Sequence, residues 1–168
     1  MSEPVLEIMP IDPRSPEASE LIRELSEEIA RRYDYIADGS GLFKVEDALV
    51  ERSAFVIGYA EGRAVACGAL RPLEDTVVEI KRMYVRPQYR GRGYAKAILA
   101  ELERLAWEQG YTSIRLETGS RQPEAIGLYE RSGYSRIPIF GIYVKSGWSE
   151  WSVCFEKQRP EPDLHSPL

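Results

Sequence analysis

The chain has 168 residues, 43% of them hydrophobic and 29% charged, which is enough for one domain with a hydrophobic core and too few for two ordinary ones. Its single histidine, His165, lies in a proline-containing tail. This excludes catalysis by a serine–histidine or cysteine–histidine pair, and it excludes a metal site built on histidines.

The formal net charge of −5 argues against nucleic acid as the main partner. No apolar run approaches the roughly 20 residues that cross a bilayer, and the first twelve residues lack the basic and apolar regions of a secretory signal. Cys67 and Cys154 each lie in a β-like run and are expected to be reduced core residues. We therefore expect a cytoplasmic protein without a membrane partner.

The N-terminal part predicts a strand followed by a long helix. Residues 5–11 are β-like, and Pro13 prevents the strand from continuing. Ser15-Pro16-Glu17 is typical of a helix start. Apolar residues then recur at helical spacing. They are Leu21, Leu25, Ile29, Tyr33 and Ile36. Gly39-Ser40-Gly41 ends this helix, and a short helix is expected over residues 45–50.

The middle of the chain predicts three consecutive strands. Residues 54–60 and 63–70 are β-like and are joined by Glu61-Gly62, which is typical of a hairpin turn. A third run covers residues 76–85. Its alternation of apolar residues slips by one between Ile80 and Met83, as a β-bulge around Lys81-Arg82 would require.

The remainder alternates helices and strands. We expect helices over residues 95–110 and 120–132, and strands over residues 113–118, 134–143 and 151–157. Residues 158–168 are proline-rich and are expected to form a disordered tail after a single domain over residues 1–157. A meander that feeds strand–helix–strand units predicts an α/β protein, with one mixed sheet and helices on both faces.

A glycine-rich turn stands between the third strand and the next helix. Arg90-Gly91-Arg92-Gly93 would let a ligand approach the backbone closely, at a helix N-terminus that favours phosphate groups. Six basic residues and no acidic one lie between positions 81 and 96. Neither the dinucleotide fingerprint nor the phosphate loop matches, so these residues alone leave open an anion site or a simple tight turn.

The stretch Gln88-x-x-Gly91-x-Gly93 resembles the Q/R-x-x-G-x-G/A signature of GNAT-type N-acetyltransferases. Residues 79–85 resemble the bulged fourth strand of that family, and residues 116–119 and 122–130 resemble its fifth strand and the following helix. Residues 140–143 and 152–157 are similar to its closing strands. The resemblance covers residues 5–157 and implies a GNAT-like, mostly antiparallel mixed sheet.

The resemblance also implies acetyl-CoA as the cofactor. The backbone of Met83 and Val85 would pair with the pantetheine arm, and the amides of residues 90–96 would hold the pyrophosphate. The residues expected to contact the cofactor are Met83, Tyr84, Val85, Gln88, Arg90, Gly91, Arg92, Gly93, Tyr94, Ala95, Lys96, Gln122 and Ala125.

Acetyl transfer to an amine needs a neutral amine, a stabilised oxyanion and a proton for the leaving thiolate. By the resemblance, Glu79 is the expected base, with Glu117 as the reserve candidate. The N–H of Met83 would stabilise the oxyanion, and Tyr129 would protonate the thiolate.

Both side-chain assignments have a plainer interpretation. Glu79 could be an exposed strand carboxylate paired with Lys81 or Arg115. Tyr129 could be a core residue on the apolar face that Ala125 and Ile126 begin.

The acceptor site is expected between the first helices and the closing strands. The residues expected to form this site are Tyr33, Tyr35, Asp38, Glu117, Phe140 and Tyr143. Trp148 and Trp151 could line this pocket or a homodimer contact. The expected partner is a small-molecule or peptide amine of open identity, and no metal is expected. A catalytically silent CoA-binding sensor and a nucleic-acid-binding protein are the rival hypotheses.

Overall fold

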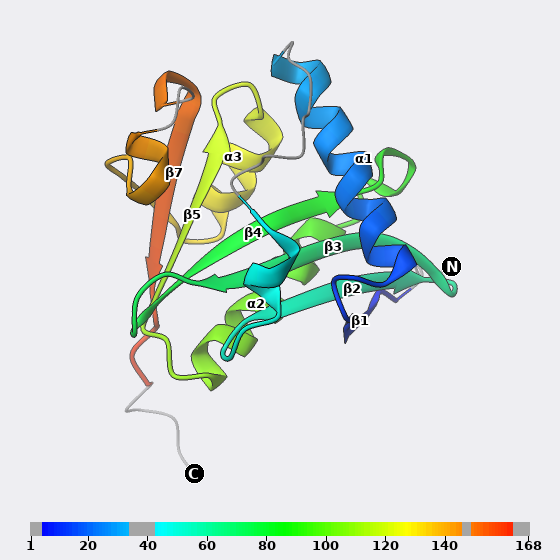
Figure 1. Cartoon of the computed structure of the whole chain (residues 1–168), viewed down its shortest axis with the longest axis horizontal. Coiled ribbons are helices and arrows are strands. Elements are labelled where there is room, and N and C mark those ends of the chain that lie inside the picture. The colour runs from blue at the N-terminus through cyan, green and yellow to red at the C-terminus, as the bar shows by residue number, and fades with distance from the viewer. Residues whose placement is uncertain (1–4, 34–42, 146–148, 163–168) are drawn as a thin grey trace.

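The computed structural model describes residues 5–33, 43–145 and 149–162, and they form one seven-stranded sheet with helices on both faces (Figure 1). The strand order is β1-β2-β3-β4-β5-β7-β6, and every neighbouring pair is antiparallel except β4 and β5. This confirms the mixed, mostly antiparallel sheet.

The strands are β1 (Glu7–Pro10), β2 (Ala54–Ala60), β3 (Arg63–Pro72), β4 (Val77–Val85), β5 (Ser113–Gly119), β6 (Ser135–Ile137) and β7 (Ser152–Gln158). The helices are α1 (Pro16–Tyr33), α2 (Tyr94–Glu108) and α3 (Pro123–Arg131). Four short 3-10 helices complete the described elements: η1 (Val45–Ala48), η2 (Pro87–Tyr89), η3 (Gly141–Val144) and η4 (Ser149–Trp151).

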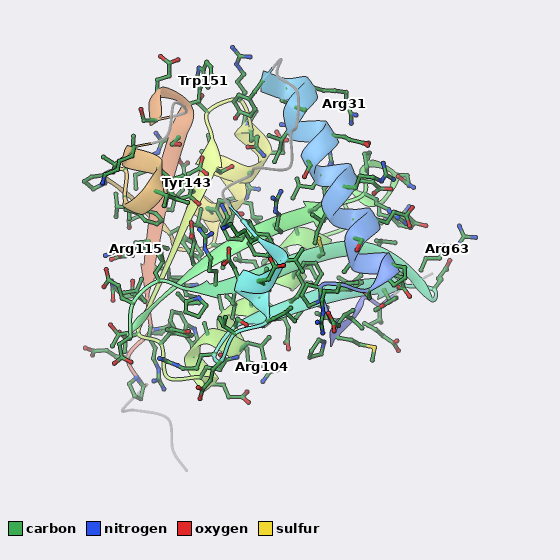
Figure 2. All side chains as sticks on the ribbon, in the orientation of Figure 1. Arg31, Arg63, Arg104, Arg115, Tyr143 and Trp151 are labelled. Atoms are coloured by element: carbon green, nitrogen blue, oxygen red, sulfur yellow. The ribbon has the colours of Figure 1, made fainter. Side chains whose placement is uncertain are left out.

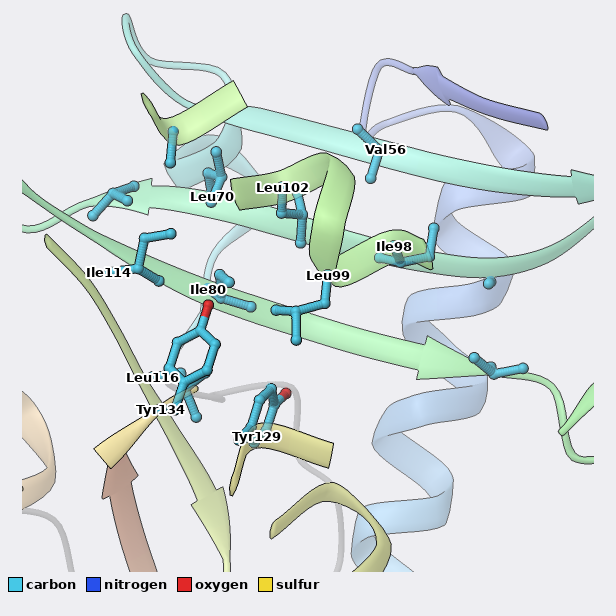
Figure 3. Packing of buried hydrophobic residues seen from close by; sticks show 14 of the residues in the cluster. Val56, Leu70, Ile80, Ile98, Leu99, Leu102, Ile114, Leu116, Tyr129 and Tyr134 are labelled. Carbon is cyan, nitrogen blue, oxygen red and sulfur yellow. The ribbon is translucent and has the colours of Figure 1, made fainter. Parts of the chain in front are cut away.

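Alternate residues of each strand point to opposite faces, so the sheet builds two apolar cores. On one face, Leu21 and Leu25 of α1 pack against a cluster that includes Ile57. On the other face, Ile98 and Leu102 of α2 pack against a larger cluster, which α3 completes (Figure 3). The expected placement of helices on both faces is confirmed.

Several local predictions are also confirmed. The hydroxyl of Ser15 accepts a hydrogen bond from the Ala18 N–H at 3.2 Å, so it caps α1 directly before Pro16. Glu61 and Gly62 both have positive φ values, 50° and 77°, as a tight hairpin turn requires. Cys67 and Cys154 are buried free thiols.

The expected bulge lies in β4. Cys67 pairs with Tyr84 and Ala69 with Lys81, so β4 has one residue more than β3 between these two pairs. Arg82 takes a left-handed conformation there, with φ 57°. Consequently Arg82 reaches α1, where its guanidinium donates to Ser26 at 3.4 Å, while Met83 packs on the α2 side.

The parallel contact between β4 and β5 is short. Only Val77 to Ile80 pair with Ser113 to Leu116, although β4 continues to Val85 and β5 to Gly119. Beyond the last pair the two strands diverge (Figure 1). The middle of the sheet is therefore open where the bulge lies.

One strand was predicted wrongly. Residues 134–143 form a strand only over Ser135–Ile137, because Pro138 has no N–H to donate to a sheet and the chain then turns into η3. At the C-terminus the sheet continues past residue 157, since Gln158 belongs to β7 and the Arg159 N–H donates to the Thr112 carbonyl at 2.8 Å.

Ile36, residues 39–41 and His165 lie outside the described residues. Of the described helices, none is both long enough and apolar enough to span a bilayer.

Candidate active site

A cleft of about 1100 Å³ passes through the opening between β4 and β5. Its walls come from the second half of β4, the loop that leads into α2, the end of β5, and helices α1 and α3. Cofactor-sized ligand sites typically occupy about 300–1,000 Å³, so this cleft can hold an extended ligand together with a second molecule. Because it crosses the sheet, it joins the α2–α3 side to the α1 side.

Most of the predicted cofactor contacts line this cleft. They are Met83, Tyr84, Val85, Arg90, Gly91, Gly93, Tyr94, Ala95, Lys96, Gln122 and Ala125. Gln88 instead borders a small separate groove beside Arg86, and the guanidinium of Arg92 lies 5.3 Å from the centroid of the Tyr89 ring. The glycine-rich turn and the diverging strands therefore belong to one continuous wall.

The N-terminus of α2 is suited to an anion. Gly93 caps the helix with φ 80° and no side-chain hydrogen bond, and no acidic residue lies in the first turn. A Cβ added at Gly91 or Gly93 would meet no atom within 4 Å, so the space in front of the backbone is open. Uncapped N–H groups and the positive end of the helix dipole favour phosphate there.

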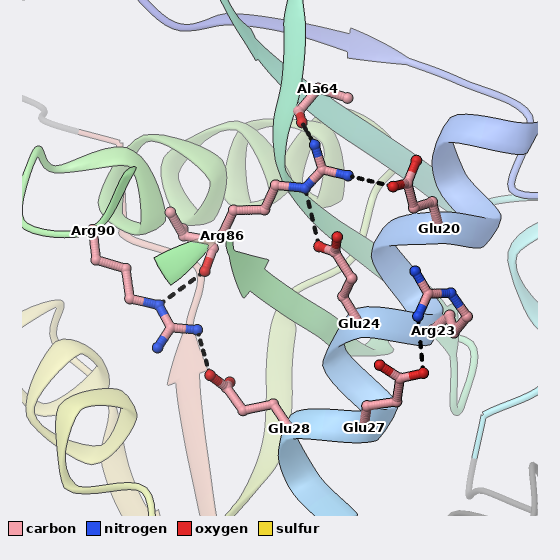
Figure 4. A network of polar contacts seen from close by, with 9 residues as sticks. Glu20, Arg23, Glu24, Glu27, Glu28, Ala64, Arg86 and Arg90 are labelled. Carbon is pink, nitrogen blue, oxygen red and sulfur yellow. Dashed lines mark hydrogen bonds and ion pairs between the residues drawn. The ribbon is translucent and has the colours of Figure 1, made fainter. Parts of the chain in front are cut away.

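Two of the basic residues around this turn, Arg86 and Arg90, are bound to glutamates of α1 (Figure 4). Arg86 Nε donates to Glu24 at 3.0 Å. Arg90 donates from Nε to the Val85 carbonyl at 2.9 Å and from a terminal nitrogen to Glu28 at 2.8 Å. A phosphate that recruited Arg90 would have to compete with Glu28.

Tyr129 lies on α3 and lines the same cleft. Its side chain is 5% exposed, and its ring centroid lies 5.7 Å from that of Tyr134 and 5.9 Å from that of Phe155. Burial, and then the charge of Glu117, raises the pKa of its hydroxyl, which therefore keeps its proton at neutral pH. Tyr129 is thus both a core residue and a protonated group on the cleft wall.

Glu79 is not the exposed carboxylate of the plainer interpretation. Its side chain is fully buried and is ion-paired with Arg71, which stands directly opposite it on β3. Tyr143 Oη donates to Glu79 Oε2 at 2.5 Å, and Arg115 pairs with Glu156 instead. Glu79 therefore lies behind the cleft wall, and its role as the base stays a prediction.

Glu117 and Lys81 are two of the ionisable groups that line the cleft on the α1 side. Each follows the last β4–β5 pair, Ile80 with Leu116. Burial raises the pKa of Glu117 and lowers that of Lys81, and the opposite charge of each partly offsets the shift of the other. Lys81 Nζ donates to Tyr143 Oη at 2.6 Å.

The predicted acceptor residues divide into two groups. Tyr33 lines the cleft, accepts a hydrogen bond from the Arg121 N–H at 3.1 Å and has its ring centroid 6.0 Å from that of Trp151. Tyr143 and Phe140 form an edge-to-face pair behind the wall, at 5.4 Å, and do not line the cleft. Tyr35, Asp38 and Trp148 lie outside the described residues.

The buried partners of Glu79 are not among the residues predicted from the sequence. Arg71 and Glu79 are cross-strand neighbours, so pairing the predicted hairpin in register could have found them. Tyr143 reaches Glu79 from η3 on the β5–β7 side of the sheet (Figure 2), and no local pattern signals that contact. Within the described ranges, no group of three or more His, Cys, Asp or Glu side chains could hold a metal ion.

Residues 16–134 match the family described as the Acetyltransferase (GNAT) family. An IAA acetyltransferase of Azospirillum brasilense is 30% identical over 125 residues, which is 74% of this chain and 80% of that protein. An uncharacterized N-acetyltransferase of Escherichia coli is 37% identical over 86 residues, 49% of this chain and 51% of the relative.

Solved structures share the fold. A Klebsiella pneumoniae protein, provisionally assigned as an acyl-CoA N-acyltransferase, is 30% identical, with a TM-score of 0.74 over 92% of this chain and 97% of that one. A GNAT family acetyltransferase of Elizabethkingia anophelis with acetyl-CoA bound is 16% identical, with a TM-score of 0.67 over 92% and 98% of the two chains.

Proposed function

Because the chain belongs to the GNAT family of acetyltransferases, we propose that it transfers the acetyl group of acetyl-CoA to a primary amine that attacks directly in a ternary complex. The observation that carries this proposal is the cleft that passes through the opening between β4 and β5. Such a passage lets a donor enter from the α2–α3 side and an acceptor from the α1 side, so that the two can react directly.

The residues on the α2–α3 side fit acetyl-CoA. The amides of the first turn of α2 would hold the pyrophosphate, and the unpaired edge of β4 beyond Ile80 would bind the pantetheine arm as an added strand. Bound there, acetyl-CoA supplies the reactive thioester. Met83 lies at the bulge without a partner on β3, so its N–H is the donor proposed for the developing oxyanion.

The proposed proton transfers use one group on each side of the sheet. Glu117 accepts the proton of the amine, a role supported by its position on the cleft and by burial, which raises its pKa and makes it a stronger base. Tyr129 gives its proton to the leaving thiolate, a role supported by its position on the opposite wall of the cleft. Glu79 does not accept the proton of the amine in this proposal. It holds Tyr143 in position, and Tyr143 in turn holds Lys81.

The test of cofactor binding is thermal denaturation with and without acetyl-CoA, because a ligand that binds only the folded state raises the melting temperature. We expect a saturable rise with acetyl-CoA or CoA, and a smaller one with ATP or NAD at equal concentration. Equal rises with all four ligands would reject the cofactor assignment.

A silent CoA-binding sensor would pass that test, so turnover must be measured separately. We expect thiol release from acetyl-CoA to depend on an added primary amine. A protein that binds acetyl-CoA, yet releases no thiol with any amine of a broad panel, would be the sensor.

A further inference from the structure

We propose that the amine acceptor also carries a carboxylate, as an amino acid does, and that Lys81 binds this carboxylate while Glu117 faces the amino group. This inference rests on the proposed function, since it assigns the acceptor of the same site. The observation behind it is a pair of oppositely charged side chains on the cleft wall that form no ion pair with each other among the described contacts.

Lys81 and Glu117 occupy equivalent positions on the two diverging strands. Ile80 and Leu116 form the last β4–β5 pair, and each belongs to the core on the α2–α3 side. The next residue of each strand therefore points to the α1 side. Both side chains line the cleft, yet the ion pairs of the described residues do not include one between them.

The charge of Lys81 is not consumed by Glu79. Arg71 already forms an ion pair with Glu79, and Tyr143 donates its only hydroxyl proton to the same carboxylate. The oxygen of Tyr143 in turn accepts the hydrogen bond from Lys81 Nζ. The buried carboxylate is thus satisfied by other groups, and this chain of contacts holds the lysine in a defined position.

The ammonium of Lys81 has more donors than the described protein satisfies. It carries three N–H groups, and its one hydrogen-bond partner in the described ranges is Tyr143 Oη at 2.6 Å. Leaving donors of a largely buried cation without acceptors is costly, and an anion in the cleft would remove that cost. Arg82, which the bulge turns to the same side, adds positive potential beside it.

The spacing limits the class of acceptor. Neighbouring strands lie about 5 Å apart, and Lys81 and Glu117 stand just where β4 and β5 begin to separate. An amino group and a carboxylate that face them must therefore be close together in the ligand, as in an α-amino acid. The neighbouring wall contains Ile29, Tyr33 and Trp151, which suits an apolar side chain.

The decisive experiment compares amino acids with the amines left after removal of the carboxylate. Alanine, leucine and phenylalanine would be paired with ethylamine, isopentylamine and phenethylamine, and thiol release from acetyl-CoA would be measured for each. We expect kcat/KM of at least one amino acid to exceed that of its matched amine about tenfold or more, the effect of one charged hydrogen bond.

Lys81→Met retains the length of the side chain and removes its charge. In this variant we expect KM for the preferred amino acid to rise about 10- to 100-fold, kcat to change less, and the preference over the matched amine to disappear. Lys145→Met is the control, because Lys145 is an exposed lysine that does not line the cleft, and it should keep the preference.

Binding of the products provides a readout that does not need turnover. With CoA present, N-acetylphenylalanine should bind at least about tenfold more tightly than N-acetylphenethylamine, and Lys81→Met should abolish the difference. Equal binding of the two compounds, or faster acetylation of every carboxylate-free amine, would overturn this inference while leaving the acetyltransferase proposal intact. A fall in kcat at unchanged KM in Lys81→Met would overturn it in favour of a proton-transfer role. Absence of acetyl-CoA binding would overturn the proposed function first, and this inference with it.

Discussion

Removal of the guanidinium of Arg71 tests how the buried part of the site is held together. Glu79 is 0% exposed and Arg71 is 14% exposed, so Arg71→Met would leave a buried carboxylate with Tyr143 but without its ion-pair partner. Breaking one side of a buried pair costs about 3–5 kcal/mol of the free energy of unfolding. In a domain of this size, that lowers the melting temperature by roughly 6–20 °C.

The assay is urea denaturation of Arg71→Met beside Arg104→Met. Arg104 is 57% exposed and pairs with glutamates on the surface of α2, so its loss should cost less than about 1 kcal/mol. Arg71→Met combined with Glu79→Met should recover part of the loss, because no buried charge is then left alone. A loss below about 1 kcal/mol for Arg71→Met, equal to that of Arg104→Met, would refute this account of the buried pair.

Three further changes address catalysis. Gly93→Val should raise KM for acetyl-CoA about tenfold or more. The control is Gly62→Val, which has a similar positive φ in a distant hairpin and should lower stability alone. Equal KM values for acetyl-CoA in the two variants would reject the cofactor turn. Tyr129→Phe should lower kcat about 100-fold or more. Tyr134→Phe, which removes a buried hydroxyl that has no hydrogen-bond partner among the described residues, should leave kcat unchanged, and full activity of Tyr129→Phe would assign Tyr129 to the core alone. Burial raises the pKa of Glu117 above its ordinary 4.5, and the base must be ionised, so kcat/KM should fall on acidification at a higher pH than an exposed glutamate would give. Glu117→Gln should abolish this acidic limb together with most of the activity, and an unchanged pH profile would exclude Glu117 as the base.

The same raised pKa has a consequence for stability. The folded protein binds the Glu117 proton more tightly than the unfolded chain does, so this group makes folding less favourable as pH rises from below 4.5 through the raised pKa. This is the opposite of the usual behaviour of a surface carboxylate.

The elements that could be predicted are those with a local cause. The cap at Ser15, the hairpin at Glu61-Gly62 and the bulge after Ile80 each follow from residues adjacent in the chain. The failed prediction was also local in origin. The prediction of one strand over residues 134–143 is wrong because Pro138 cannot donate to a sheet, and the described strand ends at Ile137.

The amino-acid sequence by itself determined the family, the mixed sheet with helices on both faces, and the position of the glycine-rich turn at the start of a helix, because these depend on periodicity and on short motifs. Only the tertiary structure decided which carboxylate meets the cleft. Glu79 and Glu117 look alike in the sequence, but Arg71 and Tyr143 enclose the first, whereas the separation of β4 from β5 opens the second to the cleft. Burial and the choice of ionic partner arise from contacts between distant segments, and that is why the sequence alone could not show which of the two carboxylates lines the cleft.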